Sequence, residues 1–238
     1  MRWQVPLPRD VGVVVVAAGQ GLRAGGGEPK QFRPIAGVPM LLRALRPFTA
    51  HPDVAQVVVV LPAEIASAPP AWLSDLGGGM LTFVAGGEER TDSVKNGLAA
   101  LKPECALVLV HDGARPFVDR LVIDRVVARA RGGVGVVPAL MVSDTLKKVT
   151  GTKEEVAETV SREGLYRAQT PQGFPVAMLT KAYAAKTSDG YVPTDEASLV
   201  EATNSGLVVL VEGSALNLKV TTPDDFVLAD AIAAQVSG

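Results

Sequence analysis

Glycines and two cations follow an apolar run near the start of the chain. Residues 11–18 include five valines. That run is too short to cross a membrane, and its β-branched content is typical of a buried strand. The residues that follow include Gly19, Gly21, Arg23 and Lys30. Backbone N–H groups of such a loop can surround phosphates while the cations neutralise them, so we predict a phosphate-binding loop, with a simple tight turn as the alternative.

The same loop partly fits a dinucleotide-binding fingerprint. Residues 19–24 match the spacing G-x-G-x-x-A after a strand. Three further glycines and Pro29 follow, and they would break the helix that this fingerprint requires. The segment 37–45, where the ribose-binding acid is expected, contains no acidic residue. A long, open and basic loop of this kind favours a triphosphate over a bridging pyrophosphate.

An acidic residue, Asp112, follows the apolar run 106–111 and precedes a glycine. A carboxylate at the end of a buried strand is a suitable ligand for Mg²⁺. A structural alternative is that Asp112 caps a turn or pairs with Arg115. We favour the metal ligand, because the carboxyl ends of parallel strands share one sheet edge, which would place Asp112 beside the glycine-rich loop.

Paired glycines follow the run 81–85 and open the segment 86–93. Glycines permit a flat ligand such as a nucleotide base to approach the backbone closely. Thr91, Asp92 or Ser93 could cap the helix that follows, and capping alone would also explain them.

Apolar runs alternate with segments of helical periodicity, which predicts an α/β fold with a mostly parallel sheet flanked by helices. The predicted strands are 11–18, 54–61, 81–85, 106–111, 134–140 and 207–212, and the predicted helices between them are 39–50, 91–101 and 119–131.

Toward the C-terminus the signals are more mixed. Residues 165–174 are expected to be irregular and 217–220 to form a short strand. Helices are predicted over 175–186, from a Thr194 cap to about residue 204, and from Thr222 to about residue 235. Ligands of such sheets gather at the carboxyl ends of the strands, so chemistry is expected just after the apolar runs.

The segment 142–162 interrupts this pattern. It is polar, but Leu146, Val149, Val156 and Val160 recur on either side of a Thr-Gly-Thr turn signal. We interpret it as an exposed β-hairpin rather than a disordered loop. An isolated hairpin is only marginally stable in water, so we expect this arm to pack on another surface, with a second copy of the chain as the candidate.

Composition limits the function classes. The 238 residues carry a net charge of −2, so there is no overall field that would favour nucleic acid or a membrane. Cys105 is the lone cysteine, which excludes an internal disulfide framework and a cysteine-rich zinc site and favours a reducing compartment, the cytoplasm. The chain has two histidines, which are too few for a histidine-rich metal site. We expect a single domain over residues 1–238.

Eight motifs in order give the chain a resemblance to the 2-C-methyl-D-erythritol 4-phosphate cytidylyltransferases. They are A-A-G-x-G-x-R at 17–23, P-K-Q-F at 29–32, G-G-x-x-R-x-x-S at 86–93, H-D-x-A-R-P at 111–116, D-T-x-K at 144–147, T-P-Q-x-F at 170–174, T-D-E-A at 194–197 and N-x-K-V-T-x-P-x-D at 217–225. Departures are small: Leu22 stands where some members carry a second arginine, Val16 where others have proline, and 24–28 is unusually glycine-rich.

The resemblance implies a Rossmann-like nucleotidyltransferase that uses CTP and Mg²⁺ and forms a homodimer through the 142–162 arm. By resemblance, the catalytic cations are Arg23, Lys30 and Lys219, and Asp112 lies next to the metal. The nucleotide would be bound by Ala17, Ala18, Gly19, Gly21, Gly86, Glu88 and Ser93. Methylerythritol phosphate would be bound by Arg115, Thr145, Arg162, Thr170 and Thr194, with Thr145 and Arg162 serving the neighbouring subunit.

The implied reaction is in-line attack of the acceptor phosphate on the α-phosphate of CTP, with pyrophosphate leaving. The acceptor phosphate is already anionic, so no general base is required. A ribitol 5-phosphate cytidylyltransferase is the nearest alternative, and molybdopterin or sugar nucleotidyltransferases are more distant. A non-catalytic nucleotide-binding scaffold is disfavoured, since it would not need three cations and an acid at one sheet edge.

Overall fold

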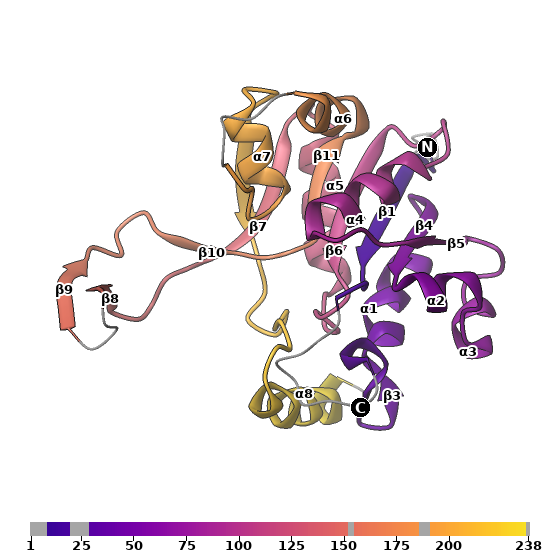
Figure 1. Cartoon of the computed structure of the whole chain (residues 1–238), viewed down its shortest axis with the longest axis horizontal. Helices are drawn as coiled ribbons and strands as arrows, with labels where there is room; N and C mark the ends of the chain where they lie inside the picture. The colour runs from indigo at the N-terminus through magenta and orange to yellow at the C-terminus, as the bar shows by residue number, and fades with distance from the viewer. Residues whose placement is uncertain (1–8, 20–28, 152–154, 186–190, 237–238) are drawn as a thin grey trace, which may run out of the picture.

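The computed structural model describes residues 9–19, 29–151, 155–185 and 191–236. Gly21, Arg23 and the rest of 20–28 lie outside the described residues. A twisted central sheet is covered by helices on both faces, and a two-stranded arm projects from one side (Figure 1). The expected α/β architecture is confirmed.

The central sheet has eight strands in the order β10-β7-β11-β6-β1-β4-β5, with β12 pairing with β7. All run in one direction except β10 and β11, which are antiparallel to their neighbours. The bounds are β1 Val11–Val16, β4 Val54–Leu61, β5 Leu81–Ala85, β6 Leu107–Asp112, β7 Gly135–Met141, β10 Tyr166–Ala168, β11 Gln172–Pro175 and β12 Val208–Glu212.

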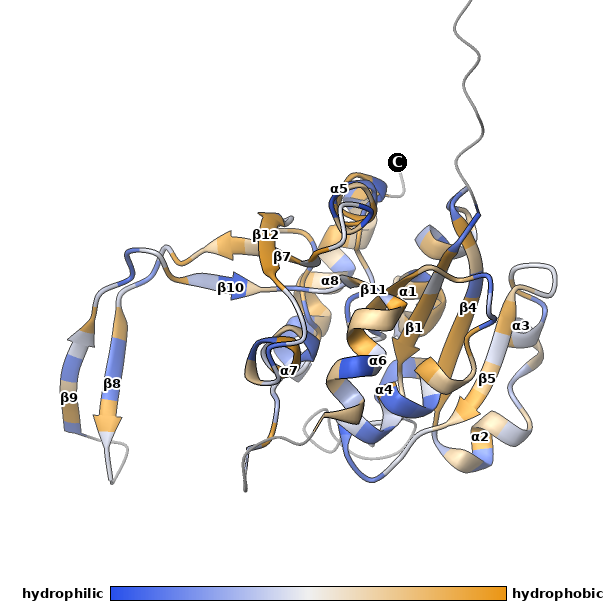
Figure 2. Cartoon of the chain, turned by 90° about the horizontal axis from the view of Figure 1, so that it is seen from above, coloured by the Kyte–Doolittle hydropathy of each residue, from blue (hydrophilic) through white to orange (hydrophobic). Residues whose placement is uncertain are grey.

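Strand β1 lies in the interior of the sheet, because it pairs in parallel with both β4 and β6. Val13, Val14 and Val15 are fully buried, so this strand is apolar on both faces, as its valine run predicts. Figure 2 shows the same hydrophobic character along β1 and β4. Val16 is in register with Asp112 of β6, which brings the residues that follow these strands to one edge of the sheet.

Two sets of helices cover the two faces. Apolar side chains of α1 and α5 join one core cluster, and those of α4, α6 and α7 join the other. Within the described part of the chain, no helix is long and apolar enough to cross a bilayer. The bounds are α1 Met40–Thr49, α2 Ala63–Ser67, α3 Ala71–Ser74, α4 Arg90–Ala99, α5 Arg120–Ala130, α6 Val176–Ala184 and α7 Glu196–Ala202.

The last helix, α8 (Pro223–Val236), packs beneath the sheet edge (Figure 1). It buries Phe226 and Ala229 against the small hairpin β2 (Pro34–Ile35) and β3 (Val38–Pro39). Its first turn has the predicted cap: the Asp225 carboxylate accepts from the Thr222 N–H at 2.8 Å, and the Asp225 N–H donates to the Thr222 hydroxyl at 3.4 Å. Arg33 lies 4.2 Å from the Phe226 ring centre, so α8 supports the segment that follows the glycine-rich loop.

The arm is an antiparallel hairpin of β8 (Leu146–Thr150) and β9 (Glu155–Val160), a sheet separate from the central one. It projects well away from the body of the molecule (Figures 1 and 2). Val149 and Val156 are 45% and 56% exposed, so apolar surface remains uncovered in the single chain. The predicted hairpin is therefore present.

Four local expectations were wrong. Residues 165–174 contain β10 and β11, because β11 fills the gap between β6 and β7, which is visible only in three dimensions. Residues 217–220 form no strand. Helix α7 is capped by Asp195, whose carboxylate accepts from the Ser198 N–H at 2.9 Å, so Thr194 lies one residue outside the cap. Helix α4 likewise begins at Arg90, before the predicted caps.

A glycine in the last turn of α4 lets this helix lie directly on the sheet. A Cβ atom at Gly97 would lie 2.4 Å from Val14 Cγ1 and 3.1 Å from Val60 Cγ2. We expect Gly97→Val to lower the free energy of unfolding by about 2 kcal/mol, since overpacked core positions cost about 1–3 kcal/mol. Urea denaturation measures this loss. Ala99→Val, on the exposed side of the same helix, is the control and should cost less than half as much; equal losses would contradict the close contact.

Candidate active site

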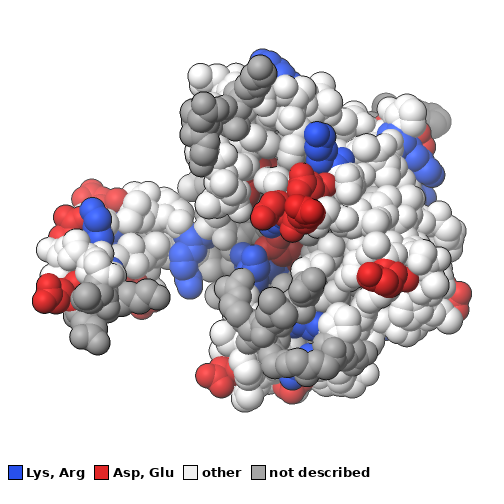
Figure 3. All heavy atoms as spheres, viewed as in Figure 1, with Lys and Arg blue, Asp and Glu red and all other residues white. Residues whose placement is uncertain are grey.

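A cavity of about 600 Å³ opens where β1, β5 and β6 end. Figure 3 shows acidic and basic side chains side by side near the middle of this view. The strand ends are connected by backbone hydrogen bonds: Gly86 N–H donates to Leu61 O at 2.8 Å, and Gly113 N–H donates to Val16 O at 2.9 Å. The cavity is lined by Val16, Ala18, Gly19, Gly87, Glu88, Glu89, Arg90, Ser93, Asp112, Ala114 and Lys219.

A second hollow of about 200 Å³ adjoins the first and shares Arg90, Asp112 and Lys219 with it. Its other lining residues are Arg115, Ala168, Gln169, Thr170, Gln172, Thr194 and Asp195. The arrangement is therefore a two-part site, in which one charged cluster faces both parts. Such a site can bind two ligands next to each other.

The carboxylate of Asp112 is the centre of this cluster. Lys219 Nζ lies 2.9 Å from Oδ2, Arg90 Nη2 lies 3.2 Å from Oδ1, and Arg115 Nε lies 3.9 Å from Oδ2. Burial alone would raise the pKa of Asp112, but Arg90 and Lys219 together lower it well below its usual range. Asp112 is consequently ionised at neutral pH.

A buried hydrogen-bond chain holds the turn that carries Asp112. The Asp112 N–H donates to the Thr170 hydroxyl oxygen at 3.0 Å, and that oxygen lies 3.1 Å from His111 Nδ1. His111 Nε2 lies 3.1 Å from the carbonyl oxygen of Arg115. A carbonyl only accepts, so Nε2 carries the proton, and Nδ1 accepts from Thr170. Burial lowers the pKa of His111 to about 4, so the ring is neutral at pH 7.

Lys30 reaches the site from the other side. Its Nζ donates to the carbonyl oxygen of Val220 at 2.8 Å, directly beside Lys219. The neighbouring Gln31 donates to the carbonyl oxygen of Ala17 at 2.8 Å. The short 3-10 helix η2 (Lys30–Phe32) is thereby attached to the end of β1, and two of the predicted catalytic cations lie on adjacent segments.

Four of the predicted nucleotide-binding residues line the first cavity: Ala18, Gly19, Glu88 and Ser93. Ala17 and Gly86 are not among its lining residues, and Gly21 lies outside the described residues. A Cβ atom at Gly86 would lie 2.3 Å from the Ala18 Cβ and 2.9 Å from the Ser93 Oγ, so only glycine fits between them. Ser93 is buried and accepts from the Gly87 N–H at 3.2 Å. Glu88 is exposed on the cavity wall. The backbone around Gly86 and Gly87 is thus free of side chains that would keep a nucleotide base away, which is the arrangement that the paired glycines predict.

The predicted acceptor residues are only partly brought together. Arg115 and Thr194 line the second hollow, and so does Thr170, although its hydroxyl is already engaged with Asp112 and His111. Thr145 and Arg162 lie beside the arm hairpin and line neither cavity, and the Arg162 guanidinium donates to the carbonyl oxygen of Ser143. Within one chain, then, these two residues are apart from the site.

Two residues that the sequence reasoning missed belong to this cluster. Arg90 Nη1 donates to Glu196 Oε1 at 2.7 Å, and Arg90 Nη2 donates to Glu196 Oε2 at 3.0 Å. Both residues stand inside quoted motifs, at 86–93 and 194–197. The available signals were that Arg90 is the one basic residue of its motif and that Glu196 directly follows the acidic residue Asp195.

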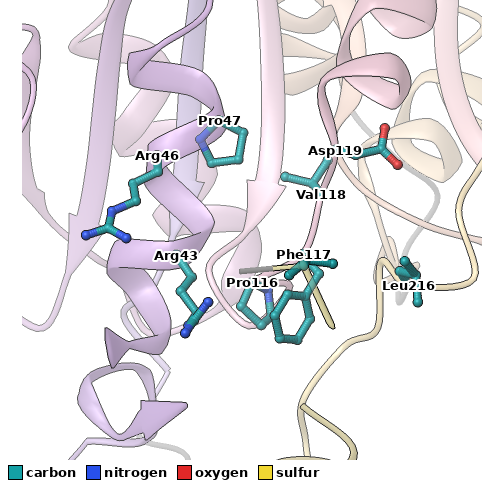
Figure 4. Close-up of a pocket in the computed structure, with 9 residues that line it drawn as sticks. Arg43, Arg46, Pro47, Pro116, Phe117, Val118, Asp119 and Leu216 are labelled. Carbon is teal, nitrogen blue, oxygen red and sulfur yellow. The ribbon is translucent and has the colours of Figure 1, made fainter. Parts of the chain in front are cut away.

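A different pocket lies between α1 and the segment that follows Arg115 (Figure 4). Its lining is mainly apolar, from Pro47, Pro116 and Phe117 among others. None of the predicted site residues lines it. Arg43, Arg46 and Asp119 also line it, so this pocket carries charges of its own, separate from the cluster around Asp112.

Comparison with known proteins identifies the family. Residues 11–235 match the family described as 2-C-methyl-D-erythritol 4-phosphate cytidylyltransferase. The chain belongs to this family. It is 44% identical over 232 residues to the cytidylyltransferase of that name from Ralstonia nicotianae, covering 93% of this chain and 90% of the relative. The crystal structure of the enzyme of that name from Thermus thermophilus superposes with a TM-score of 0.77 at 38% identity, covering 93% of this chain and 98% of that one.

Some family relatives are longer. A bifunctional enzyme IspD/IspF from Rhodospirillum rubrum is 43% identical over 221 residues, covering 92% of this chain but 56% of the relative. The chain therefore spans a little over half the length of the bifunctional relatives and nearly the whole length of the single-function cytidylyltransferases.

The buried neutral His111 predicts a pH-dependent stability. The unfolded chain binds a proton near pH 6.5 and the folded chain only near pH 4. The stabilisation is thus complete above pH 6.5 and is lost as the pH falls toward 4, by about 3 kcal/mol in total. We expect His111→Gln to weaken this part of the pH dependence, measured by urea unfolding between pH 4.5 and 7 without divalent cations. An unchanged slope in the variant would contradict the assignment.

Proposed function

We propose that this chain transfers a cytidylyl group from CTP to 2-C-methyl-D-erythritol 4-phosphate and releases pyrophosphate in non-mevalonate isoprenoid synthesis. The observation that carries the proposal is the single charged cluster of Asp112, Lys219 and Arg90, which lines both of the adjoining hollows. Nucleotidyl transfer requires a triphosphate and an acceptor phosphate to meet at one place, with cations around the reacting phosphorus.

In the proposed step an oxygen of the acceptor phosphate attacks the α-phosphorus of CTP. An O–P bond forms, the bond from the α-phosphorus to the bridging oxygen breaks, and its electron pair leaves with pyrophosphate. The attacking oxygen is already anionic, so no proton has to be removed. His111 fits this account, because both of its ring nitrogens are engaged in buried hydrogen bonds and its pKa is lowered to about 4.

Positioning and charge neutralisation would then supply the catalysis. Lys30 and Lys219 lie on adjacent segments at the sheet edge and are suited to the triphosphate oxygens. Arg115 lines the second hollow and is suited to the acceptor phosphate, since a guanidinium binds phosphate with paired hydrogen bonds. Arg23, proposed as a further cation on the triphosphate, lies outside the described residues.

Mg²⁺ is the proposed metal, and Asp112 the residue that would hold it. Among the described residues no group of three or more His, Cys, Asp and Glu side chains could hold a metal ion. Mg²⁺ in nucleotide enzymes is commonly held by one or two carboxylates together with substrate phosphates. The buried Asp112 fits that pattern only when the triphosphate supplies the other oxygens. The bound metal would neutralise charge on those oxygens.

A homodimer is proposed because the acceptor site is incomplete in one chain. Thr145 and Arg162, which the resemblance assigns to the acceptor, lie beside the projecting arm and away from both hollows. The exposed Val149 and Val156 of the arm supply apolar surface for a partner. We propose a single domain with 142–162 as the dimerisation arm, acting in the cytoplasm, where the lone buried Cys105 would stay reduced.

Acceptor preference tests the function. With CTP and Mg²⁺, we expect pyrophosphate release with methylerythritol 4-phosphate and at least about tenfold less with ribitol 5-phosphate, because a pocket that hydrogen-bonds one polyol leaves polar groups unpaired with another. A coupled pyrophosphate assay measures both. Preference for ribitol 5-phosphate would overturn the assignment of Thr145, Arg162, Thr170 and Thr194. CTP binding without turnover on either acceptor would favour the scaffold alternative.

Mixed dimers test the shared site. Lys30→Ala and Arg162→Ala should each lower kcat by about a hundredfold, since each removes a cation from the transition state. A scrambled equimolar mixture of the two variants should regain about a quarter of wild-type activity, because half of the dimers are mixed and each holds one intact site. Lys181→Ala, exposed on α6, is the control and should be unaffected. No recovery on mixing would contradict sharing.

A further inference from the structure

Glu196 is a buried carboxylate at the edge of the active site. It is the first residue of α7, immediately after the Asp195 cap, and its side chain is 1% exposed. Both of its oxygens accept from the guanidinium of Arg90, at 2.7 and 3.0 Å. The hydroxyl of Tyr183 lies 3.3 Å from Oε1 and donates to it. Burial raises the pKa of Tyr183, as does the neighbouring Glu196, so that hydroxyl keeps its proton.

Stability alone does not explain this ion pair. Removing two charges from water is costly, and replacing a buried pair by apolar residues is often neutral or stabilising. The ion pair also reaches Asp112. The same Arg90 Nη2 atom that donates to Glu196 lies 3.2 Å from Asp112 Oδ1 and donates to it. Burial on its own would lower the pKa of Arg90, but Glu196 and Asp112 together raise it, so Arg90 stays charged. Glu196 therefore acts on Asp112 through Arg90.

The two closest cations of Asp112 differ in how firmly they are held. The Lys219 side chain is 45% exposed and lines both hollows, so it can move from Asp112 to a phosphate. The Arg90 side chain is 30% exposed and is fixed by the two bonds to Glu196. When a triphosphate takes Lys219, Arg90 remains to orient Asp112.

We propose that Glu196 is a positioning residue for the metal-binding carboxylate. By holding both Nη atoms of Arg90, it limits this guanidinium to one hydrogen bond with Asp112 and leaves the other lone pairs of Asp112 for Mg²⁺. The proposal rests on the proposed function, since it assigns Asp112 to the metal of nucleotidyl transfer. It also connects α7, which follows Thr194 at the acceptor hollow, to the metal-binding end of β6.

If Glu196 were neutral, the Arg90 guanidinium would be free to rotate and to donate two hydrogen bonds to the Asp112 carboxylate. A guanidinium and a carboxylate form a paired, two-bond contact when nothing else holds the guanidinium. That contact would occupy the oxygens that Mg²⁺ needs. The expected defect is therefore specific to the metal, and binding of CTP without metal should change little.

The test compares CTP affinity with and without Mg²⁺ by titration calorimetry, without acceptor and hence without turnover. In the wild type we expect Mg²⁺ to tighten CTP binding. In Glu196→Gln, which keeps the shape of the side chain, the ratio of the two affinities should fall about tenfold, the usual effect of removing a group that orients a metal ligand. The half-saturating Mg²⁺ in the pyrophosphate assay should rise by a similar factor. A wild-type ratio in a folded Glu196→Gln variant would overturn the proposal.

Two further variants separate positioning from folding. Arg131→Gln removes a comparable pair at the opposite sheet edge, where Arg131 Nη2 lies 2.9 Å from Asp10 and 3.2 Å from Asp53; it should lower stability and leave the ratio unchanged. If Arg131→Gln lowers the ratio equally, the effect is one of stability and the proposal fails. If Glu196→Gln does not fold, Glu196→Asp replaces it, because the shorter side chain keeps the charge but cannot hold both Nη atoms of Arg90, and a wild-type ratio there overturns the proposal.

Failure of the proposed function is distinguishable from failure of this inference. A wild-type chain that binds CTP equally with and without Mg²⁺, or releases no pyrophosphate with either acceptor, contradicts the proposed function itself. A wild-type chain that does both, together with a variant that matches it, contradicts only the role of Glu196.

Discussion

The structure depends on holding one buried carboxylate, Asp112, among cations at the end of β6. A buried charge is tolerated only when it is paired and hydrogen-bonded. Lys219, Arg90 and Arg115 supply the pairing, and the Asp112 N–H is anchored on Thr170. Each of these partners comes from a different part of the chain. The sheet brings them together because β6 lies between β1 and β11, so the end of the strand is surrounded on both sides.

This constraint connects the site to the packing of the core. The valine run of β1 is buried on both faces and registers Val16 against Asp112. Gly97 allows α4 to lie close to that strand, and the first residue of α4 is Arg90. The distance from a core glycine to an active-site arginine is therefore two helical turns. The close packing of Gly97 against the sheet thus helps to set the position at which the Arg90 guanidinium contacts Asp112.

The sequence predicted the elements whose signals are local. The six apolar runs became six strands of the central sheet. Helices α5 and α8 begin within one residue of the predicted starts, and Asp119 and Thr222 make capping contacts there. Strands β10 and β11 were missed, because their pairing with β6 and β7 depends on segments far away in the chain. For the same reason Arg90 and Glu196, 106 residues apart, could not be paired from sequence.

The two halves of the site differ in how completely one chain can form them. The nucleotide half needs only strand ends and the turns that follow them, and a parallel sheet places these at one edge. The acceptor half, as proposed, draws on Thr145 and Arg162, which sit beside a hairpin that extends away from the body. A hairpin with exposed valines gains stability only against another surface. If that surface is a second copy, the same apolar contact that stabilises the arm also completes the acceptor site, so assembly and acceptor binding are coupled.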